Sequence, residues 1–534
     1  MGVLYNTGKL QPSEVVQTIA DRIFETLAKR FPVCSASDEF HYFPQVQAQK
    51  HSWSAWDDFS QEAIEDIAGE LSIWEEDLSR LAKKHPDKDT LIDISMLIRV
   101  ARTLRKELTE VRFQQTQPTF YLTIASIGLT EALDHNAVAW EDRVKGLPSF
   151  LDQARNNLNH IPSLFRDLGI EMVIDTRSWL SSIQNNRPGL GPVFKALDRF
   201  EDHLRQASTC DNFLISSEIL ERIIYGHIGC CMGIEDVQEE LDQEIREMVK
   251  IMNEEARRLD HNSSWGEAIE SIPLPPLPED GLIALYRHAV LGLGKHCLEQ
   301  GLVTHDIYSS CPVSVEPIPS YLSAVRSAAA YSMSPGHPPH GGTFFIVDLN
   351  LEKVQQKTLH RDCHMVAAHE TYPGHHLLDA SRWNLNRAIR RPLEFPLFYE
   401  GWACFAEELM IHTGYFRGPA ERLLLARRNF LRAIRGKVDI GIQTGKMDLQ
   451  AAASYLVRAG ISKDRALSIV RRYALKPGYQ SCYTIGLRRF RELYKRFGGD
   501  NPRDFALKVL PQGEIGFDNL EDVLMSEPDT AHHV

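Results

Sequence analysis

Apolar residues spaced three and four positions apart recur along most of this chain and predict a protein built mainly from α-helices. The clearest segments are 60–84, 90–114, 191–208 and 216–260, in which apolar residues on the helical period alternate with charged ones. Clusters of Pro, Gly and Asn lie between these segments and stop the helices. We therefore expect a mainly α fold.

A proline-rich segment at residues 271–281 marks the expected boundary within the chain. Proline lacks a backbone N–H and fixes φ, so this segment is predicted to be an extended connector. The sequence thus predicts a helical N-terminal region at 1–270 and a second region at 271–534, with one continuous domain as the alternative. In the second region, residues 341–349 begin with glycines and continue with aromatic and β-branched residues, which predicts a short β-strand.

The composition is that of an ordinary globular protein. Of 534 residues, 43% are hydrophobic and 25% charged, and the net charge of -13 argues against nucleic acid or an anionic membrane as the partner. No uncharged apolar stretch reaches membrane-spanning length. Residues 1–9 lack a basic stretch followed by an apolar run, and the nine cysteines include no Cys-x-x-Cys pair. We expect a cytoplasmic protein, and its oligomeric state stays open.

Residues 369–376, His-Glu-Thr-Tyr-Pro-Gly-His-His, contain the side chains that hydrolytic zinc enzymes use. Neutral histidines hold a divalent metal in such enzymes, and a neighbouring glutamate takes a proton from the metal-bound water. The usual spacing is His-Glu-x-x-His, in which positions i and i+4 share a helix face. Here position i+4 from His369 is Pro373, which cannot bind a metal.

A break in the helix at residues 372–374 would restore the geometry. Proline disrupts the helical turn, and the glycine that follows tolerates the resulting backbone. Looping out the extra residues would bring either His375 or His376 back to His369, and the spacing alone does not decide between them. Glu370 is then the expected general base. The alternative is a solvated helix end that carries two histidines by chance.

Residues 398–409 predict a buried helix that carries acidic side chains. Glu400 and Glu407 lie on one stripe of this helix among aromatic residues, where a carboxylate is costly to bury unless a positive group meets it. A metal would be that group for Glu400, and Glu407 would support the ligands from behind. The alternative is that both acids pair with arginines such as Arg382 or Arg387.

The two motifs together resemble a known signature. His-Glu-x-x-Pro-Gly-His-His followed by Glu-Gly-Trp-Ala at residues 400–403 resembles the domain of unknown function 885 family, which looks like a branch of the gluzincin metallopeptidases. Segments at 143–148, 154–158 and 472–486 are also similar to that family. The resemblance implies a large helical gluzincin-like metallopeptidase fold with a small β-sheet beside the metal helix. The strand at 341–349 would be either an edge along which a peptide substrate lies or a core strand.

The resemblance also implies roles for individual residues. Glu-Gly-Trp-Ala is similar to the Asn-Glu-Gly-Phe-Ala segment of aminopeptidase N-type enzymes, whose glutamate is the third zinc ligand, and this carries that role onto Glu400. In related oligopeptidases the second histidine follows a glycine, which favours His375, with His376 as the alternative. Tyr483 resembles the tyrosine that stabilises the oxyanion in those enzymes, and Tyr479 replaces a usual glutamine. The expected substrate-binding residues are Tyr473, as a second oxyanion donor, and Arg472 and Arg488, as carboxylate binders.

These residues predict a zinc-dependent hydrolase that cleaves amide or peptide bonds of short peptides or peptide-like metabolites. His369, His375 and Glu400 would hold Zn²⁺, and Glu370 would activate water. A biosynthetic enzyme that uses iron or manganese on a small amino-acid derivative is the main alternative, because two histidines and a carboxylate suit those metals as well. A third is a helical scaffold with a decayed site, against which the intact Glu370 speaks.

Overall fold

The structure of the protein is a computed structural model that describes residues 11–46, 52–84, 86–135, 137–185, 187, 189–318, 329–347, 353–499 and 501–526. The predicted mainly α fold is confirmed, because helices predominate and the described residues form only two small sheets. Two compact units are present. The described residues of Met1–Ile219 and Arg387–Leu393 belong to unit 1, and those of Leu220–Ile318, Ala328–Asn386 and Glu394–Val534 to unit 2.

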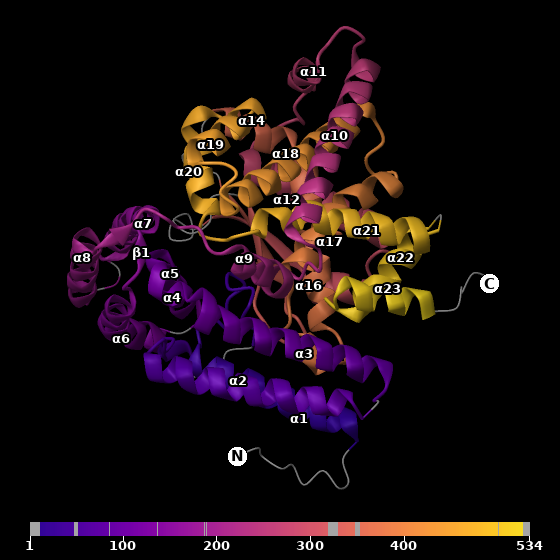
Figure 1. The fold of residues 1–534 in the computed structure, drawn as a ribbon. Coiled ribbons are helices and arrows are strands. Elements are labelled where there is room, and N and C mark those ends of the chain that lie inside the picture. Colours follow the sequence, from indigo (N-terminus) through magenta and orange to yellow (C-terminus); the bar gives the residue numbers. More distant parts are fainter. Residues whose placement is uncertain are drawn as a thin grey trace. The chain divides into compact units, whose positions relative to one another are not determined.

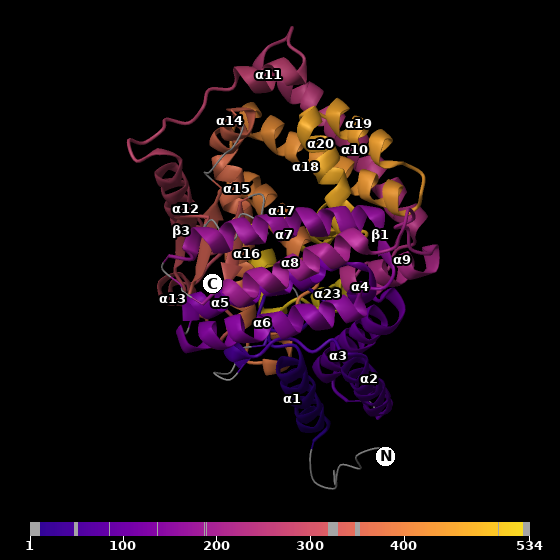
Figure 2. The same cartoon turned by 90° about the vertical axis from the view of Figure 1, so that its left-hand side faces the viewer.

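Unit 1 consists of two groups of packed helices. The first group is α1 (Pro12–Arg30), α2 (Gln61–Ala82) and α3 (Lys88–Lys106), and the second is α5 (Pro118–His135), α6 (Ala137–Asn157), α7 (Ser163–Ile183) and α8 (Gly191–Gln206) (Figures 1 and 2). Shorter elements are η1 (Ser52–Ser54), η2 (Glu107–Val111), α4 (Phe113–Thr116), η4 (Ala388–Arg390) and the parallel pair β1 (Ile161–Pro162) and β2 (Thr209–Cys210). The segment predicted at 90–114 is therefore not one helix, since α3 gives way to a π-helical turn at Glu107.

Unit 2 contains the candidate site. Its helices before the sheet are α9 (Ser217–Ile223, which begins in unit 1), η3 (Ile224–Ile228), α10 (Ile234–Leu259), α11 (Trp265–Ser271), α12 (Gly281–Glu299) and α13 (His305–Ser310). After the sheet follow α14 (Lys353–Arg361), α15 (Cys363–Glu370), α16 (His375–Trp383), α17 (Pro396–His412), α18 (Pro419–Gln443), α19 (Leu449–Arg458), α20 (Lys463–Tyr473), η5 (Tyr479–Ser481), α21 (Cys482–Phe497), α22 (Pro502–Val509), η6 (Leu510–Gln512) and α23 (Phe517–Ser526).

Two boundaries differ from the sequence prediction. The segment at 216–260 is interrupted, because Gly229 adopts a left-handed φ of 88° that ends η3 before α10 begins. The region boundary predicted at residue 270 falls inside unit 2, where α10 packs along α18. The proline-rich segment after α11 is an extended connector as predicted, but it joins two parts of the same unit.

The predicted strand is confirmed as β5 (Gly342–Ile346). It lies between β3 (Val313–Pro317), to which it is parallel, and β4 (Ala330–Met333), to which it is antiparallel. Because both sides of β5 are paired, the core-strand alternative is confirmed and the alternative of a substrate-binding edge is wrong. The last two positions of the predicted strand, 348 and 349, lie outside the described residues.

A contact between two glycines joins α17 to α21. A Cβ atom on Gly401 would lie 2.6 Å from the Cα of Gly486, so the two backbones touch with no side chain between them. Aromatic rings of the same two helices also pack together, with the ring centres of Trp402 and Phe490 5.5 Å apart. This approach places the segment around Glu400 next to the first turn of α21.

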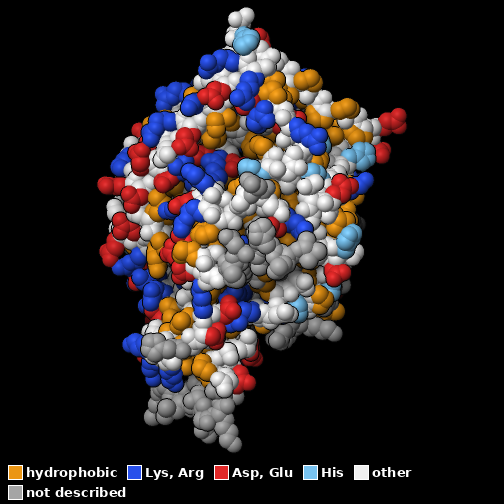
Figure 3. All heavy atoms as spheres, turned by 90° about the vertical axis from the view of Figure 1, so that its right-hand side faces the viewer, with side chains coloured by type: hydrophobic (Ala, Val, Ile, Leu, Met, Phe, Trp, Pro, Cys, Tyr) orange, Lys and Arg blue, Asp and Glu red, His pale blue; other side chains and the backbone are white. Residues whose placement is uncertain are grey.

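Three further features are the surface charge, the apolar character of the helices and the state of the cysteines. On the face drawn in Figure 3, basic and acidic side chains are interspersed. Among the described residues, none of the helices combines the length and the apolar character needed to cross a bilayer. All nine cysteines are free thiols.

Candidate metal centre

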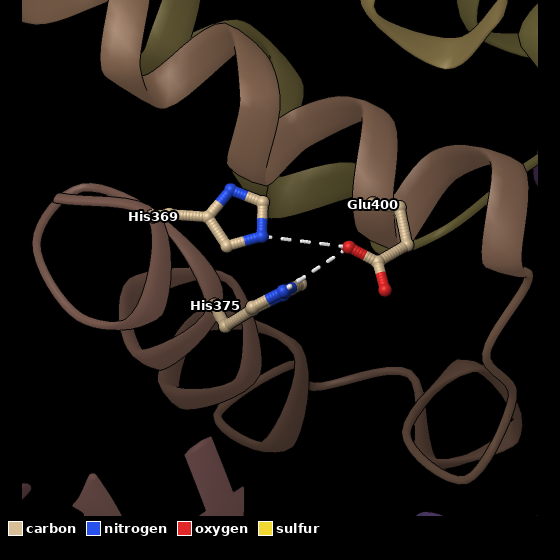
Figure 4. A group of neighbouring side chains, drawn as sticks. All are labelled: His369, His375 and Glu400. Atoms are coloured by element: carbon tan, nitrogen blue, oxygen red, sulfur yellow. Dashed lines mark ion pairs between the residues drawn. The ribbon is translucent and has the colours of Figure 1, made fainter. Parts of the chain in front are cut away.

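Three buried side chains of unit 2 converge on one point (Figure 4). His369 comes from the end of α15, His375 from the start of α16 and Glu400 from α17. Nε2 of each histidine lies 3.5 Å from Oε2 of Glu400. One ligand atom from each residue lies within 4.8 Å of the other two, so a single ion between them could be reached by all three. The structure thus brings together the three predicted ligands.

The donor set fits a zinc ion. Glu400 Oε2 is buried and has no hydrogen-bond partner among the described residues, although two imidazole nitrogens face it. Burial alone would raise the pKa of Glu400, but the adjacent His369 and His375 lower it well below the usual range of a glutamate. A buried anionic oxygen without a donor is costly unless a cation neutralises it. Two imidazoles and one carboxylate are a set that catalytic zinc sites use.

The predicted helix break is present and produces this convergence. α15 ends at Glu370 and α16 begins at His375, with a tight loop at residues 371–374. A Cβ atom on Gly374 would lie 1.8 Å from the carbonyl oxygen of His369, so the loop can close only with glycine at this position. The loop folds the chain back and returns His375 to the neighbourhood of His369.

The helix that supplies Glu400 also fixes the loop. Nε1 of Trp402 donates a hydrogen bond of 2.9 Å to the Pro373 carbonyl, and Oγ1 of Thr371 donates one of 2.6 Å to the Ala367 carbonyl. Trp402 follows Glu400 by two residues on α17. The Glu-Gly-Trp-Ala segment therefore provides a candidate ligand, the glycine of the helix contact and the hydrogen bond that holds the loop.

His376 is not a ligand in this arrangement. Its Nε2 lies 2.9 Å from the Cys311 carbonyl, which can only accept, so Nε2 carries the proton. The Tyr331 hydroxyl then donates a hydrogen bond of 2.9 Å to Nδ1 of His376. Burial lowers the pKa of His376 to about 4, which keeps the ring neutral. Because both ring nitrogens are occupied, His375 is the histidine that remains for a metal.

Glu407 lies behind His369. Its Oε1 is 3.0 Å from Nδ1 of His369, and its carboxylate also accepts hydrogen bonds from Arg428, at 2.8 Å from Nε, and from Arg432. Burial would raise the pKa of Glu407, but Arg428 and Arg432 lower it well below the usual range. Nη2 of Arg432, which can only donate, also lies 3.2 Å from this Nδ1. An anionic Glu407 can only accept, so it would hold a proton on Nδ1 of His369 and leave the lone pair of Nε2 for a metal.

The arginines predicted as alternative partners lie elsewhere. Arg382 sits among three buried carboxylates of unit 2, and Arg387 belongs to unit 1, where it pairs with Asp93. The carboxylates around Arg382 are those of Asp379, at 2.7 Å, and Glu394 and Glu514, each at 3.3 Å. Neither acid of α17 therefore pairs with Arg382 or Arg387, but the alternative of pairing with arginines holds for Glu407, which meets Arg428 and Arg432. The guanidinium of Arg382 is engaged by the second acidic cluster of this unit.

Replacing Glu407 with Gln should weaken zinc binding by roughly 10- to 100-fold, because the amide no longer holds the Nδ1 proton of His369 with a full charge. Competition with a fluorescent zinc chelator measures this affinity. The matched control is Glu299→Gln, which changes an exposed glutamate on α12. Equal zinc affinity in the Glu407 variant and the control would show that zinc binding does not depend on the contact between Glu407 and His369.

Glu370 has the properties of a proton acceptor. It ends α15 directly beside His369 and is half-buried, and its carboxylate has no hydrogen-bond partner among the described residues. Burial raises its pKa, an effect that His369 and His375 oppose and Glu400 adds to. A glutamate with a raised pKa and no structural partner suits general base catalysis.

Two tyrosines lie against the cluster from the C-terminal side. The hydroxyl of Tyr479 donates a hydrogen bond of 2.9 Å to Oε1 of Glu400. The ring of Tyr483 lies 6.0 Å from that of Tyr479, and burial together with the charge of Glu400 raises its pKa well above the usual value. Both side chains are half-buried. Tyr483 was predicted, whereas Tyr479 was marked in the sequence only by its departure from the family pattern.

The predicted substrate-binding residues are distributed differently. Tyr473 accepts a hydrogen bond of 3.0 Å from Nε of Arg435, a residue that sequence reasoning missed. Arg472 is exposed at the end of α20. Arg488 binds the carboxylates of three glutamates on α10, so the structure does not support its predicted role. The missed arginines, Arg428, Arg432 and Arg435, share one face of α18, and this spacing was the available signal.

The fold and this cluster define a mainly helical protein with a candidate metal centre of two histidines and one glutamate. The chain belongs to the family described as bacterial protein of unknown function (DUF885), whose model matches residues 46–524. The predicted family is thereby confirmed, whereas a relation to gluzincins is not shown. None of the curated proteins matches the chain.

Two solved structures share the fold. One, of a candidate lipoprotein of unknown function from Shewanella oneidensis, has a TM-score of 0.72 and 15% identity over 96% of this chain and 99% of that chain. The other, of a candidate lipoprotein from Colwellia psychrerythraea, has a TM-score of 0.77 and 16% identity over 97% of this chain and 99% of that chain. At this identity the likeness concerns the fold alone.

Proposed function

We propose that this protein is a zinc-dependent hydrolase that cleaves amide or peptide bonds of short peptides or peptide-like metabolites. The observation that carries the proposal is the convergence of His369, His375 and Glu400 with the unpartnered Glu370 beside them. A scaffold would gain nothing from a buried carboxylate oxygen without a donor. A ligand set of three also leaves a zinc ion one position for water, as hydrolytic sites require.

Each residue of the site has a place in such a reaction. His369 and His375 would bind zinc through Nε2 and Glu400 through Oε2. A zinc ion in such a site supplies an activated water and polarises the carbonyl that the water attacks. Glu370 takes the proton from the water and passes it to the leaving amine. The Tyr483 hydroxyl donates a hydrogen bond to the oxyanion that forms.

The first test is metal analysis of the purified protein and of the His369→Ala variant. We expect about one zinc per chain in the parent protein and none in the variant. The control is His364→Ala, which removes another histidine of α15. Nδ1 of His364 contacts the Tyr415 hydroxyl. No metal in the parent protein after zinc is supplied, or equal zinc in all three proteins, would reject the site.

The same measurement separates the proposal from its alternative. Iron or manganese in place of zinc would favour the biosynthetic enzyme, since this donor set also suits those ions. A requirement for dioxygen during turnover would then identify an iron oxygenase rather than a hydrolase.

We also propose a gluzincin-like relationship and a cytoplasmic location. The first is supported by the order of the ligands, with a His-Glu pair on one helix and the glutamate ligand on a later one. The second is supported by nine free cysteines, which are typical of a reducing compartment. The two structural neighbours are described as lipoprotein candidates, so cell fractionation is the measurement that decides the location.

A further inference from the structure

Arg435 is a cation beside the candidate centre that has no anionic partner. Among the described residues it makes no ion pair, and its hydrogen bonds go to neutral oxygens. Nε lies 3.0 Å from the Tyr473 hydroxyl and 3.0 Å from Oε1 of Gln480, which also accepts from Nη2. The Nη1 group donates no hydrogen bond within the described part of the chain.

Four neighbouring arginines are matched by carboxylates. Arg428 and Arg432, on the same helix, share Glu407. On α21, Arg488 pairs with glutamates of α10, and Arg491 pairs with Glu408 and Glu244. Arg435 differs from these four arginines, because no carboxylate of the described residues pairs with its half-buried guanidinium. Such a group has lost part of its hydration and gains from any anion that approaches it.

Asp439 is the acid nearest along α18, but it serves another purpose. Its carboxylate accepts backbone hydrogen bonds from Gly478, at 3.2 Å, and from Gln480, at 2.9 Å, and it makes no ion pair with Arg435. It fixes the loop that leads into α21. Burial raises the pKa of Asp439 to about 7, and the charge of Arg435 counteracts this rise, but the two side chains form no ion pair.

The position of Arg435 connects it to the site. Its guanidinium carbon lies 5.1 Å from the centre of the Tyr483 ring, which stabilises a cation over its face. Tyr479, which precedes Gln480, donates its hydroxyl proton to Glu400. One layer of side chains thus separates the guanidinium from the carboxylate of the candidate metal ligand.

We propose that Arg435 binds a carboxylate of the substrate, so that the substrates are short peptides or amides with a free carboxylate close to the scissile bond. A guanidinium matches a carboxylate in charge and geometry, and the Nη1 side is the one that Gln480 and Tyr473 leave available. The reaction rests on the proposed hydrolase function, whereas the carboxylate site is a binding property that can be tested without turnover.

The test is equilibrium dialysis of the Glu370→Gln protein against an equimolar tripeptide library in two forms, with free C-terminal carboxylates and with C-terminal amides. Mass spectrometry measures the bound fraction of each form. We expect the carboxylate form to be enriched roughly tenfold, as for a charge-assisted contact, and the enrichment to fall to about one when Arg435→Gln is added. No enrichment, or equal enrichment with and without Arg435, would overturn the inference.

A second variant separates a role of Arg435 in substrate binding from a purely structural role in holding the loop. Gln480→Glu keeps the length of the side chain but gives Arg435 an internal carboxylate, so we expect the carboxylate preference to disappear although Arg435 is still present. If Arg435 only holds the loop, this change would strengthen the contact and leave the preference unchanged, which would overturn the inference. Circular dichroism and thermal unfolding check that both variants are folded.

The outcomes also separate this inference from the proposed function. A zinc-loaded protein that cleaves amidated and free peptides equally well would retain the hydrolase and reject the carboxylate site. A protein without zinc that still shows an Arg435-dependent preference would retain the carboxylate site and reject the hydrolase.

Discussion

Replacing Glu370 with Gln is expected to lower turnover by about 10²- to 10⁴-fold, the usual contribution of a general base. The amide has nearly the same size as the carboxylate but cannot take a proton from water. Because Glu370 has no hydrogen-bond partner among the described residues, the change should leave the fold and the zinc content intact. The measurement is initial rates on a substrate found by screening peptides and amides with the zinc-loaded protein.

The control for this prediction is again Glu299→Gln on the exposed face of α12, which should keep full activity. Unchanged turnover in the Glu370 variant would remove the proposed base. Loss of zinc together with activity would also contradict the assignment, because it would give Glu370 a part in holding the metal instead.

Replacing Gly374 with Ala should destroy the candidate metal centre. The added Cβ would lie 1.8 Å from the carbonyl oxygen of His369 and 2.5 Å from that of Ala368, and both are backbone atoms that cannot rotate away. The loop must open, so His375 moves away from His369. We expect zinc binding to be lost and the free energy of unfolding to fall by at least about 2 kcal/mol. Metal analysis and chemical denaturation measure the two effects.

A glycine on an exposed helix surface provides the matched control. Gly69 lies within α2, and a Cβ there would meet no atom within 4 Å. Gly69→Ala should therefore raise the stability by about 0.5–1 kcal/mol through the better helix propensity of alanine, with the zinc content unchanged. Full zinc occupancy in the Gly374 variant would show that the loop tolerates a side chain and would contradict the steric argument.

Local chemistry made much of the site predictable. The helix break follows from the proline and glycine in residues 372–374. The acids of α17 are recognisable in the sequence because they are charged residues on an otherwise apolar helix. The choice between His375 and His376 was not accessible in the same way. It depends on Tyr331 and Cys311, which are distant in sequence and reach His376 only in the folded chain.

The misassigned features are those fixed by long-range packing. Prolines at 271–281 break the helical pattern but do not tell whether the flanking helices share a core, and α10 packs on α18 across that segment. Partners of buried charges are equally non-local, since Glu407 meets arginines of α18 that lie 21 and 25 residues further along the chain. The spacing of Arg435 with Arg428 and Arg432 is visible in the sequence, but only the folded chain shows that those two pair with a carboxylate and Arg435 does not.

The contact between Gly401 and Gly486 restricts how this site can change, both in motion and in evolution. With backbone against backbone, no intervening side chain can be enlarged, trimmed or rotated to adjust the separation of the two helices. Glu400 and the first turn of α21 should therefore move as one rigid piece. Substrate access must therefore depend on movements of other elements around the site. A change of substrate specificity in evolution must likewise arise from substitutions outside the contact of these two helices.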